Sequence, residues 1–393
     1  MASSKKPPLS NETLLTHLGR WPDEQHGLIN TPVSRGSTIL FPNLKSLQDL
    51  SQPYSYGRTG NPSSRSVEEL VTALEGGTGT RLAPSGLAAL SCALMSTLSS
   101  GDDVLVTDSA YEPTRKFCDN YLTRMGVSVR YYGPRIGTGI SQLLKENTKA
   151  ILVESPGSLT FEIQDLPAIS AARGQSDIAI IVDNTWATPL FYRPLELGAD
   201  ITVHAGTKMF VGHSDTSFGT ITANEKYWPQ LHATHYQLGL CAAPDDCFLA
   251  ARGLRTLAIR MDEHQARALE IARWLEAHNL VTRVLHPALP THPDNALFRR
   301  DFAGSGSLFS FALPRAPQAA LAALFDDMEL FGIGYSWGGY ESLILPVDLS
   351  QNRTVTTPER DEQIIRLHIG FEDIDDLKND LSAGLERYRS AMG

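Results

Sequence analysis

Strand-length apolar segments alternate with helical segments through the middle of this 393-residue chain. Strands separated by helices usually pair in parallel, and a parallel sheet requires helices on both of its faces. The alternation therefore predicts an α/β fold around a mostly parallel sheet. Binding sites in such sheets lie beyond the carboxyl ends of the strands. The predicted strands span residues 103–107, 127–132, 149–154, 178–183 and 199–204.

The chain is long enough for two domains, and its patterns divide it into three parts. Residues 1–60 are rich in Pro, Ser and Asn, which predicts an extended arm that packs on a neighbouring subunit. Residues 61–250 form the predicted large domain. A long helix over about residues 246–278 leads into a smaller C-terminal α/β domain at residues 251–393, which ends in a helix at residues 373–389.

Lys208 follows the apolar run at residues 199–203 and lies among small and polar residues in the sequence HAGTKMFVGHSD. Burial disfavours the ammonium form of a lysine, so a lysine at the mouth of a buried strand can become a nucleophile near neutral pH. A surface lysine is an equally good interpretation of Lys208 alone. Asp183 ends the preceding strand, and a lysine and a carboxylate at neighbouring strand ends are what a pyridoxal phosphate enzyme needs.

Two further patterns are typical of anion binding. Ser85, Gly86 and Leu87 lie between a strand and a helix, where backbone amides and the helix dipole attract phosphate, although such turns are common in proteins generally. Arg366 lies in the apolar sequence IIRLHIG, where an unpaired charge is costly to bury. Arg366 therefore has either a structural salt bridge or a place in a cleft that receives an anionic group.

The charge balance and the cysteines argue against several other classes of protein. A net charge of −10, from 34 basic and 44 acidic side chains, disfavours partners such as nucleic acid or an anionic membrane. Four cysteines without paired spacing predict reduced thiols, with no disulfide framework or zinc site.

No transport signal is expected either. The N-terminal sequence MASSKKPPLS has no following apolar run, and no segment reaches the ~18 apolar residues of a membrane span. We therefore expect a cytoplasmic protein. His204, His213 and His368 lie near the candidate residues but lack metal-ligand spacing, so we predict hydrogen-bonded structural histidines and no metal site.

The motifs occur in the order of a known family. From about residue 30 to its end, the chain resembles the Cys/Met-metabolism family of pyridoxal phosphate enzymes. The motifs that carry the resemblance are YSYGRTGNPS, SGL, AYEP, ESPGSLTFE, DNTW, TKMFVGHSD, YSWGGYESLIL and IRLHIGFED. The resemblance implies a fold-type I enzyme with a seven-stranded-type sheet in its large domain. It also implies pyridoxal 5'-phosphate as cofactor and a homo-oligomer, expected as a tetramer of two dimers that share their sites.

The resemblance also implies roles for individual residues. The implied catalytic residues are Lys208, Tyr111 and Tyr56. The implied cofactor-binding residues are Lys208, Asp183, Gly86, Leu87, Tyr111, Thr207, Tyr56 and Arg58, the last two serving the neighbouring subunit's site. The implied substrate-binding residues are Arg366, Ser336, Trp337 and Tyr335. Leu87 replaces the usual Met, and Ala205 replaces a Ser found in many relatives, which removes one hydroxyl contact.

The activity implied by the resemblance is β-elimination of sulfur from a thioether amino acid such as cystathionine, which yields homocysteine, pyruvate and ammonia. Glu112 and Pro113 match the β-lyase version of their motif, and Tyr335 lies where γ-acting relatives commonly carry Glu. The alternatives within the family are a γ-lyase, a γ-synthase, a methionine γ-lyase and a broader cysteine-S-conjugate lyase. The alternative from another class is a cofactor-free binding protein with the same fold.

Overall fold

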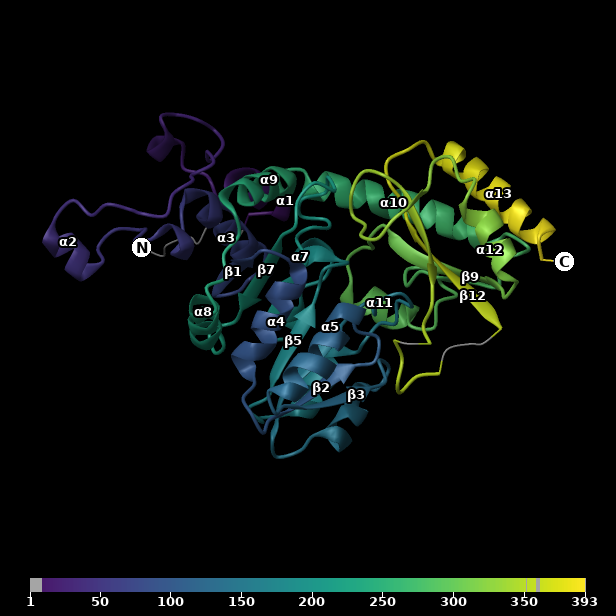
Figure 1. Cartoon of the computed structure of the whole chain (residues 1–393), viewed down its shortest axis with the longest axis horizontal. Coiled ribbons are helices and arrows are strands. Elements are labelled where there is room, and N and C mark those ends of the chain that lie inside the picture. Colours follow the sequence, from purple (N-terminus) through teal and green to yellow (C-terminus); the bar gives the residue numbers. More distant parts are fainter. Residues whose placement is uncertain (1–8, 351, 358–360, 393) are drawn as a thin grey trace, which may run out of the picture.

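The computed structural model describes residues 9–350, 352–357 and 361–392. The two lysines of the N-terminal sequence MASSKKPPLS lie outside these residues, so the expectation about a signal segment falls largely beyond the described chain. An arm, a large domain and a C-terminal domain follow one another along the molecule (Figure 1). No helix in the described part of the chain is long and apolar enough to cross a membrane.

The large domain is built on a seven-stranded sheet, and its strands confirm the predicted mostly parallel fold. Five strands pair in parallel in the order β6 (Ile201–His204), β5 (Ala179–Asp183), β4 (Thr148–Glu154), β2 (Asp103–Thr107) and β3 (Ser128–Tyr132). Two strands complete the other side: β7 (Gly219–Ala223) runs antiparallel to both β6 and β1 (Gly79–Ala83). The sequence analysis did not predict β7.

Helices cover both faces of this sheet. Along β5, Ile181 packs on the face covered by α4 (Gly86–Thr97) and α8 (Trp228–Gln237). Ile180 and Val182 pack on the opposite face, with residues of α6 (Leu166–Arg173). A strand buried on both faces has no polar side, which explains the continuous apolar runs in the sequence. Each fully buried Leu or Ile side chain contributes about 1.5–3 kcal/mol.

The C-terminal domain has a second sheet of five strands. In spatial order these are β10 (Gly332–Ile333), β11 (Leu343–Val347), β12 (Glu362–His368), β9 (Leu308–Pro314) and β8 (Arg283–Leu285). Two helices, α12 (Gln318–Phe325) and α13 (Ile374–Ser390), pack with this sheet in one apolar cluster. This second layer of sheet and helices confirms the predicted smaller α/β domain.

The predicted helix at residues 246–278 is two helices, α9 (Pro244–Leu254) and α10 (Leu257–Glu276). The break lies where the carbonyl of Gly253 accepts hydrogen bonds from the Arg260 side chain, at 2.8 Å, and from Thr256 N, at 3.1 Å. These bonds occupy the carbonyl that a continuous helix would use internally. The second helix still bridges the domains, because its first half packs with α3 (Pro62–Glu75) and α9 and its second half packs under the C-terminal sheet (Figure 1).

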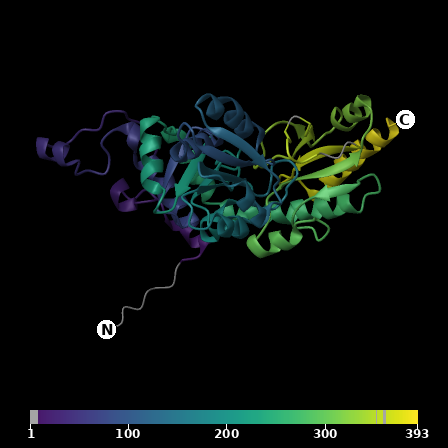
Figure 2. The same ribbon diagram turned by 90° about the horizontal axis from the view of Figure 1, so that it is seen from below.

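The N-terminal arm is only partly extended. Its helix α1 (Asn11–His17) packs on the large domain of the same chain through Leu15, which is buried. The later part projects away from the body (Figure 2) and carries helix α2 (Leu44–Asp49), in which no residue is buried. An isolated bridge between Thr38 and Tyr56 closes the base of this loop. The expectation of an extended arm is therefore wrong for these two helices, and its packing on a neighbouring subunit stays a prediction.

The projecting loop exposes large apolar side chains. Leu40 is 84% exposed, and Leu44, Leu47 and Leu50 are also largely in solvent. Apolar side chains gathered on a projecting loop usually mark a surface that another chain covers.

Candidate active site

The predicted site residues meet at the carboxyl edge of the large sheet, where the C-terminal domain faces it. Lys208 lies in the turn after β6, and its backbone N–H donates to Ala205 O at 3.0 Å. Its Nζ donates to Ser336 Oγ of the C-terminal domain at 2.6 Å and lies 5.6 Å from the centre of the Trp337 ring. The two domains therefore enclose the lysine amine together.

This enclosure changes the acidity of the amine. Burial lowers the pKa of Lys208 to about 8, and the nearby Arg366 cation acts in the same direction, whereas Asp183 opposes both. A lysine with this pKa carries an appreciable fraction of neutral amine near neutral pH. The sequence-based prediction of a partly buried, reactive lysine agrees with this environment.

Asp183 ends β5 and is held by the residue two positions further on. Its carboxylate accepts from Thr185 N at 3.0 Å and from Thr185 Oγ1 at 2.5 Å. Burial raises the pKa of Asp183, while the bonds from Thr185 and the positive charges of His204 and Lys208 oppose the rise. Thr185 Oγ1 also accepts from Ala205 N at 2.8 Å, so Thr185 joins the turn of Asp183 to the turn of Lys208.

The role of Thr185 was not predicted in the sequence analysis, where it was only part of the DNTW motif. The usable signal is a hydroxyl residue two positions after a strand-end Asp, where its hydroxyl and backbone amide can both reach the carboxylate.

Glu154 is a second, partly buried carboxyl group beside Asp183. The two residues end adjacent parallel strands and face each other in register. Glu154 Oε2 accepts from the backbone N–H of Tyr111 at 2.7 Å. Burial, and then the charge of Asp183, raise the pKa of Glu154 well above its ordinary value. Glu154 is therefore expected to stay neutral and to fix the backbone of Tyr111, a role that strand-end position alone did not reveal.

The start of α4 lies against the Lys208 turn. Ser85 caps this helix by accepting from Ala88 N at 3.1 Å, and the first-turn amides of Gly86 and Leu87 have no intrahelical acceptor. A Cβ atom on Gly86 would lie 2.4 Å from Ala205 Cβ and 2.7 Å from Ala205 Cα. Gly86 is therefore needed for the close approach of an anion-attracting helix end to the lysine turn.

Thr207, predicted to add a hydroxyl to a phosphate site, already bonds to Phe218. Its Oγ1 accepts from Phe218 N at 2.8 Å and donates to Phe218 O at 3.1 Å. The hydroxyl proton must turn away from Phe218 O before Thr207 can donate to a phosphate.

Arg366 has no carboxylate partner among the residues that the structure describes. Its Nη2 donates to the backbone carbonyl of Ser336 at 3.1 Å. Burial lowers the pKa of Arg366 to about 10, against the influence of Tyr111 and Tyr335. Of the two interpretations open from sequence, the salt bridge is not seen, and a guanidinium that can receive an anionic group is supported.

Tyr335 and Trp337 flank Ser336 in different surroundings. The Tyr335 side chain is 90% exposed, whereas Trp337 is half-buried near Lys208. Burial and the nearby charge of Asp183 raise the pKa of Tyr111, so its hydroxyl keeps its proton near neutral pH.

Tyr56 and Arg58 lie on the arm and are held by other partners within one chain. Arg58 Nη1 donates to Tyr236 O at 3.1 Å, and its guanidinium carbon lies 4.8 Å from the centre of the Tyr236 ring. Tyr56 is half exposed. A single chain thus gathers the other predicted residues and leaves this pair outside.

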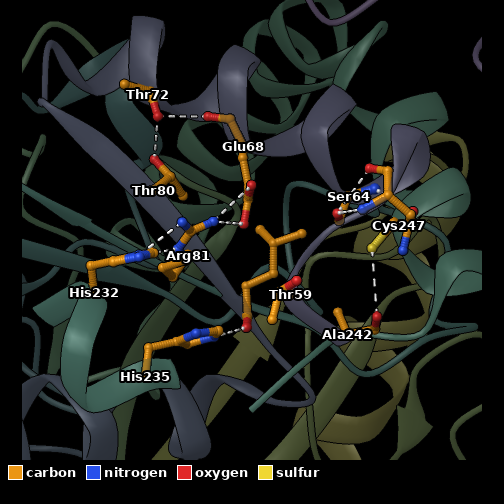
Figure 3. Close-up of polar contacts among 12 residues, drawn as sticks. Thr59, Ser64, Glu68, Thr72, Thr80, Arg81, His232, His235, Ala242 and Cys247 are labelled. Atoms are coloured by element: carbon orange, nitrogen blue, oxygen red, sulfur yellow. Dashed lines mark hydrogen bonds and ion pairs between the residues drawn. The ribbon is translucent and has the colours of Figure 1, made fainter. Parts of the chain in front are cut away.

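Another arginine, Arg81, contrasts with Arg58, because it lies in an ion pair (Figure 3). Arg81 Nη1 lies 3.0 Å from Glu68 Oε1, and Arg81 Nε donates to His232 Nδ1 at 2.9 Å. Arg81 therefore has a carboxyl partner within the chain, although burial raises the pKa of Glu68 to about 7. Arg58 makes no ion pair with any carboxylate in the described chain, which leaves its charge available to an anion.

The three candidate histidines make hydrogen bonds of the kind predicted. His204 Nε2 bonds to Glu75, His213 Nδ1 lies 2.7 Å from Val211 O, and His368 Nδ1 lies 2.7 Å from Ser307 Oγ. No cluster of three or more His, Cys, Asp or Glu suited to a metal occurs in the portion of the chain that the structure describes.

The groups at this edge match what one cofactor requires. A partly neutral lysine can bond an aldehyde, a buried carboxylate can hold a pyridine nitrogen protonated, and the amides of a helix start can bind a phosphate. Fold and site together define a pyridoxal phosphate enzyme of fold type I. The sequence family described as Cys/Met metabolism PLP-dependent enzyme matches residues 12–386, and the chain belongs to this family.

Several named relatives are similar to this protein over nearly its whole length. A putative cystathionine β-lyase of Rhizobium johnstonii is 48% identical over 95% of each chain. The cystathionine β-lyase of Salmonella typhimurium is 39% identical and covers 96% of this chain and 98% of its own. The solved cystathionine γ-synthase of Xanthomonas oryzae, in complex with aminoacrylate and cysteine, has a TM-score of 0.90 at 31% identity and covers 98% of this chain and all of its own. These similarities confirm pyridoxal phosphate as the cofactor and leave the particular reaction open.

Lys208→Ala is predicted to abolish turnover and to remove the visible absorbance of the lysine-bound cofactor. The fold should persist, because Lys208 lies in a turn and makes no core contact. Steady-state turnover is expected to fall by about 10³-fold or more. Circular dichroism of the same variant checks that it is folded. Lys226→Ala is the matched control, because Lys226 is an exposed lysine paired with Asp177. Normal activity in Lys208→Ala would overturn the assignment of the site.

Glu154→Gln is predicted to gain stability over the wild type as pH rises. Glu154 stays protonated in the folded protein but ionises above ~4.3 in the unfolded chain, so unfolding of the wild type releases a proton and its stability falls with pH. The amide has no such proton. From about pH 5 to about pH 7 the difference in free energy of unfolding should grow by up to about 1.4 kcal/mol per pH unit.

Urea unfolding at several pH values measures this difference. Glu225→Gln changes an exposed glutamate and should show no such trend. A constant difference between Glu154→Gln and wild type would mean that Glu154 ionises in the folded state.

Proposed function

We propose that the protein is a cystathionine β-lyase: a carbon–sulfur lyase that converts L-cystathionine and water into homocysteine, pyruvate and ammonia. The observation that carries this proposal is the wall formed around Ser336. Aromatic residues flank Ser336 on both sides, and Tyr335 lies where γ-acting family members commonly carry a glutamate. γ-Elimination needs a second proton removal, from Cβ, so a wall without that carboxylate favours β-cleavage.

The surroundings of the two aromatic side chains support this interpretation. Tyr335 does not pack under the turn, since its side chain is 90% exposed, and its hydroxyl is near enough to Arg366 to affect the pKa of that guanidinium. Trp337 lies beside Lys208. Both side chains are therefore placed to contact a substrate whose carboxylate is bound by Arg366.

The proposed mechanism assigns each step to a group of this chain. Arg366 binds the α-carboxylate through its guanidinium. The neutral amine of Lys208, steadied by Ser336 Oγ at 2.6 Å, removes the proton from Cα. The sulfur leaves from Cβ and takes a proton from the Lys208 ammonium or from the protonated Tyr111 hydroxyl. Asp183 would hold the pyridine nitrogen protonated, and pyridoxal phosphate, when bound, would supply the electron sink that acidifies the α-proton.

We further propose that the active enzyme is a cytoplasmic homo-oligomer, a tetramer of two dimers, in which Tyr56 and Arg58 complete the neighbouring subunit's site. The support is threefold. The pair lies on the arm, Arg58 has no carboxylate partner among the residues that the structure describes, and the arm loop exposes Leu40, Leu44, Leu47 and Leu50. Arg58 would bind the cofactor phosphate, for which a guanidinium fork is well suited.

Product analysis is the direct test of β-cleavage. The wild type should form pyruvate and homocysteine from cystathionine, with little 2-oxobutyrate and cysteine. The double substitution Tyr335→Glu with Trp337→Leu should increase the 2-oxobutyrate share, because it introduces a carboxylate and a smaller side chain at the wall. Chromatography of the keto acids measures the ratio. If 2-oxobutyrate is the main keto acid of the wild type, the protein is a γ-lyase and the interpretation of Tyr335 is wrong.

Mixing two inactive variants tests the shared site. Lys208→Ala and Arg58→Ala subunits, mixed equally and allowed to exchange, should recover roughly a quarter of wild-type activity. Half of the randomly formed dimers are hybrids, and each hybrid has one site with both residues intact. Fluorescence transfer between labelled subunits confirms that exchange occurs. No recovery after demonstrated exchange would show that the arm serves its own chain.

A further inference from the structure

We propose that His368 is a positioning residue that holds the turn of Ser336, Trp337, Gly338 and Gly339 over Lys208. The inference rests on the proposed function only in taking Lys208 as the reactive amine. It concerns a side chain that makes no hydrogen bond to Lys208 or Arg366 in the described part of the chain. His368 is the last residue of β12, two positions beyond Arg366, and its side chain is fully buried between the turn and β9.

The imidazole joins the turn to the sheet through both ring nitrogens. Nε2 lies 3.2 Å from Gly338 N and 3.1 Å from Gly339 O, while Nδ1 lies 2.7 Å from Ser307 Oγ. The Gly338 N–H points at Nε2, so the proton belongs on Nδ1, which donates to Ser307. The other neutral tautomer would donate from Nε2 to Gly339 O and accept from Ser307. Either neutral form therefore binds one backbone group of the turn and the same serine.

The turn needs an internal anchor because of its shape. Ser336 has φ +75° and Gly338 has φ +87°, and a non-glycine residue is strained in the left-handed region and persists there only when its surroundings enforce it. Tyr335 is exposed and contributes little packing, whereas Trp337 of the same turn packs against two apolar clusters. The His368 ring supplies hydrogen bonds from the inner side.

The turn lies directly on the backbone of the reactive lysine. A Cβ atom on Gly338 would lie 2.9 Å from Lys208 C and 3.0 Å from Lys208 Cα. The same turn carries Ser336, whose Oγ contacts Lys208 Nζ and whose carbonyl accepts from Arg366 Nη2. A shift of this turn would therefore move a contact of the proposed base and a contact of the proposed carboxylate ligand together.

His368 performs this role as a neutral ring. Burial lowers its pKa to about 3, with His264, Arg366 and Lys208 as cationic or titratable neighbours that act in the same direction. Gly338 N–H also disfavours a second ring proton, since it points at the nitrogen that would carry it. The ring is therefore a hydrogen-bonded spacer of fixed geometry and not a proton donor to the reaction.

Two uncharged substitutions of His368, to Gln and to Asn, distinguish a positioning role from a general loss of core packing. Gln places a polar atom near the position of Nε2 and can keep the bond to the turn, whereas Asn places one near Nδ1 and can keep only the bond to Ser307. Both remove the aromatic ring, so both lose similar packing. His292→Asn is the control for replacing a buried histidine, because His292 lies 4% exposed at the other side of the C-terminal domain and bonds to Asp294 N.

The first readout is the pKa of Lys208 in the full-length chain stripped of cofactor, obtained from the pH dependence of its labelling by an amine reagent and peptide mass spectrometry. Wild type, His368→Gln and His292→Asn should agree near the value of about 8. His368→Asn should shift upward by about one unit, because a loosened turn admits water to the amine. This readout needs no substrate, so it stands even if the enzyme proves to be a γ-lyase.

The second readout is steady-state kinetics of the holoenzyme. His368→Asn should lower kcat/KM by about tenfold or more through both kcat and KM, since small displacements of reacting groups cost up to about 10²-fold, and His368→Gln should recover most of it. Equal behaviour of Asn and Gln, or an unchanged Lys208 pKa in a folded His368→Asn protein, would overturn the proposal. If His368→Asn does not fold, Ser307→Ala serves instead: an upward shift of Lys208 supports the anchor, and no shift overturns it.

Discussion

The chemistry proposed for this protein depends on keeping one lysine amine partly out of water. Lys208 belongs to the large domain, but its Nζ is enclosed by Ser336 and Trp337 of the C-terminal domain. The lowered pKa is therefore a property of the docked domains and not of the lysine turn alone. Trp186 Nε1, which donates to Leu308 O at 2.8 Å, and Ser310 Oγ, which donates to Leu159 O at 2.8 Å, help to fix that docking.

The parallel sheet also places two carboxyl groups close to this amine. Strands β4 and β5 end in register at Glu154 and Asp183, so their side chains reach the same edge. Two carboxylates side by side, both partly removed from water, repel each other, and this repulsion is relieved when one of them keeps its proton. Thr185 donates two hydrogen bonds to Asp183 and so favours ionisation there, whereas Glu154 receives one bond from Tyr111 N. The proton therefore belongs on Glu154, and the negative charge stays where the pyridine nitrogen is expected.

The sequence predicts those parts of the site that depend on local pattern and strand order. Asp183 and Lys208 follow apolar strands, so a parallel sheet necessarily brings them to one edge. The enclosure of Lys208 by the Ser336 turn could not be derived in this way, because it depends on how two domains dock. The hydrogen bonds of Glu154 and His368 could not be derived from local pattern either. Glu154 bonds to Tyr111, 43 residues away, and His368 bonds to Ser307, 61 residues away. Apolar periodicity also missed the break before α10, which results from one Arg260 side chain occupying the carbonyl of Gly253.

The arm gives the proposed assembly a thermodynamic consequence. In the described chain Arg58 packs on Tyr236 without a carboxylate partner, whereas Arg81 pairs with Glu68. If Arg58 completes the phosphate site of a neighbour, the cofactor binds the assembled form more tightly than the separate chains. Linkage then requires the reverse effect, so bound cofactor strengthens association by the same free energy. Association also removes the exposed leucines of the arm loop from water. Assembly, cofactor retention and the positioning of the phosphate are thus one coupled equilibrium under this proposal, with Arg58 as the side chain that links them.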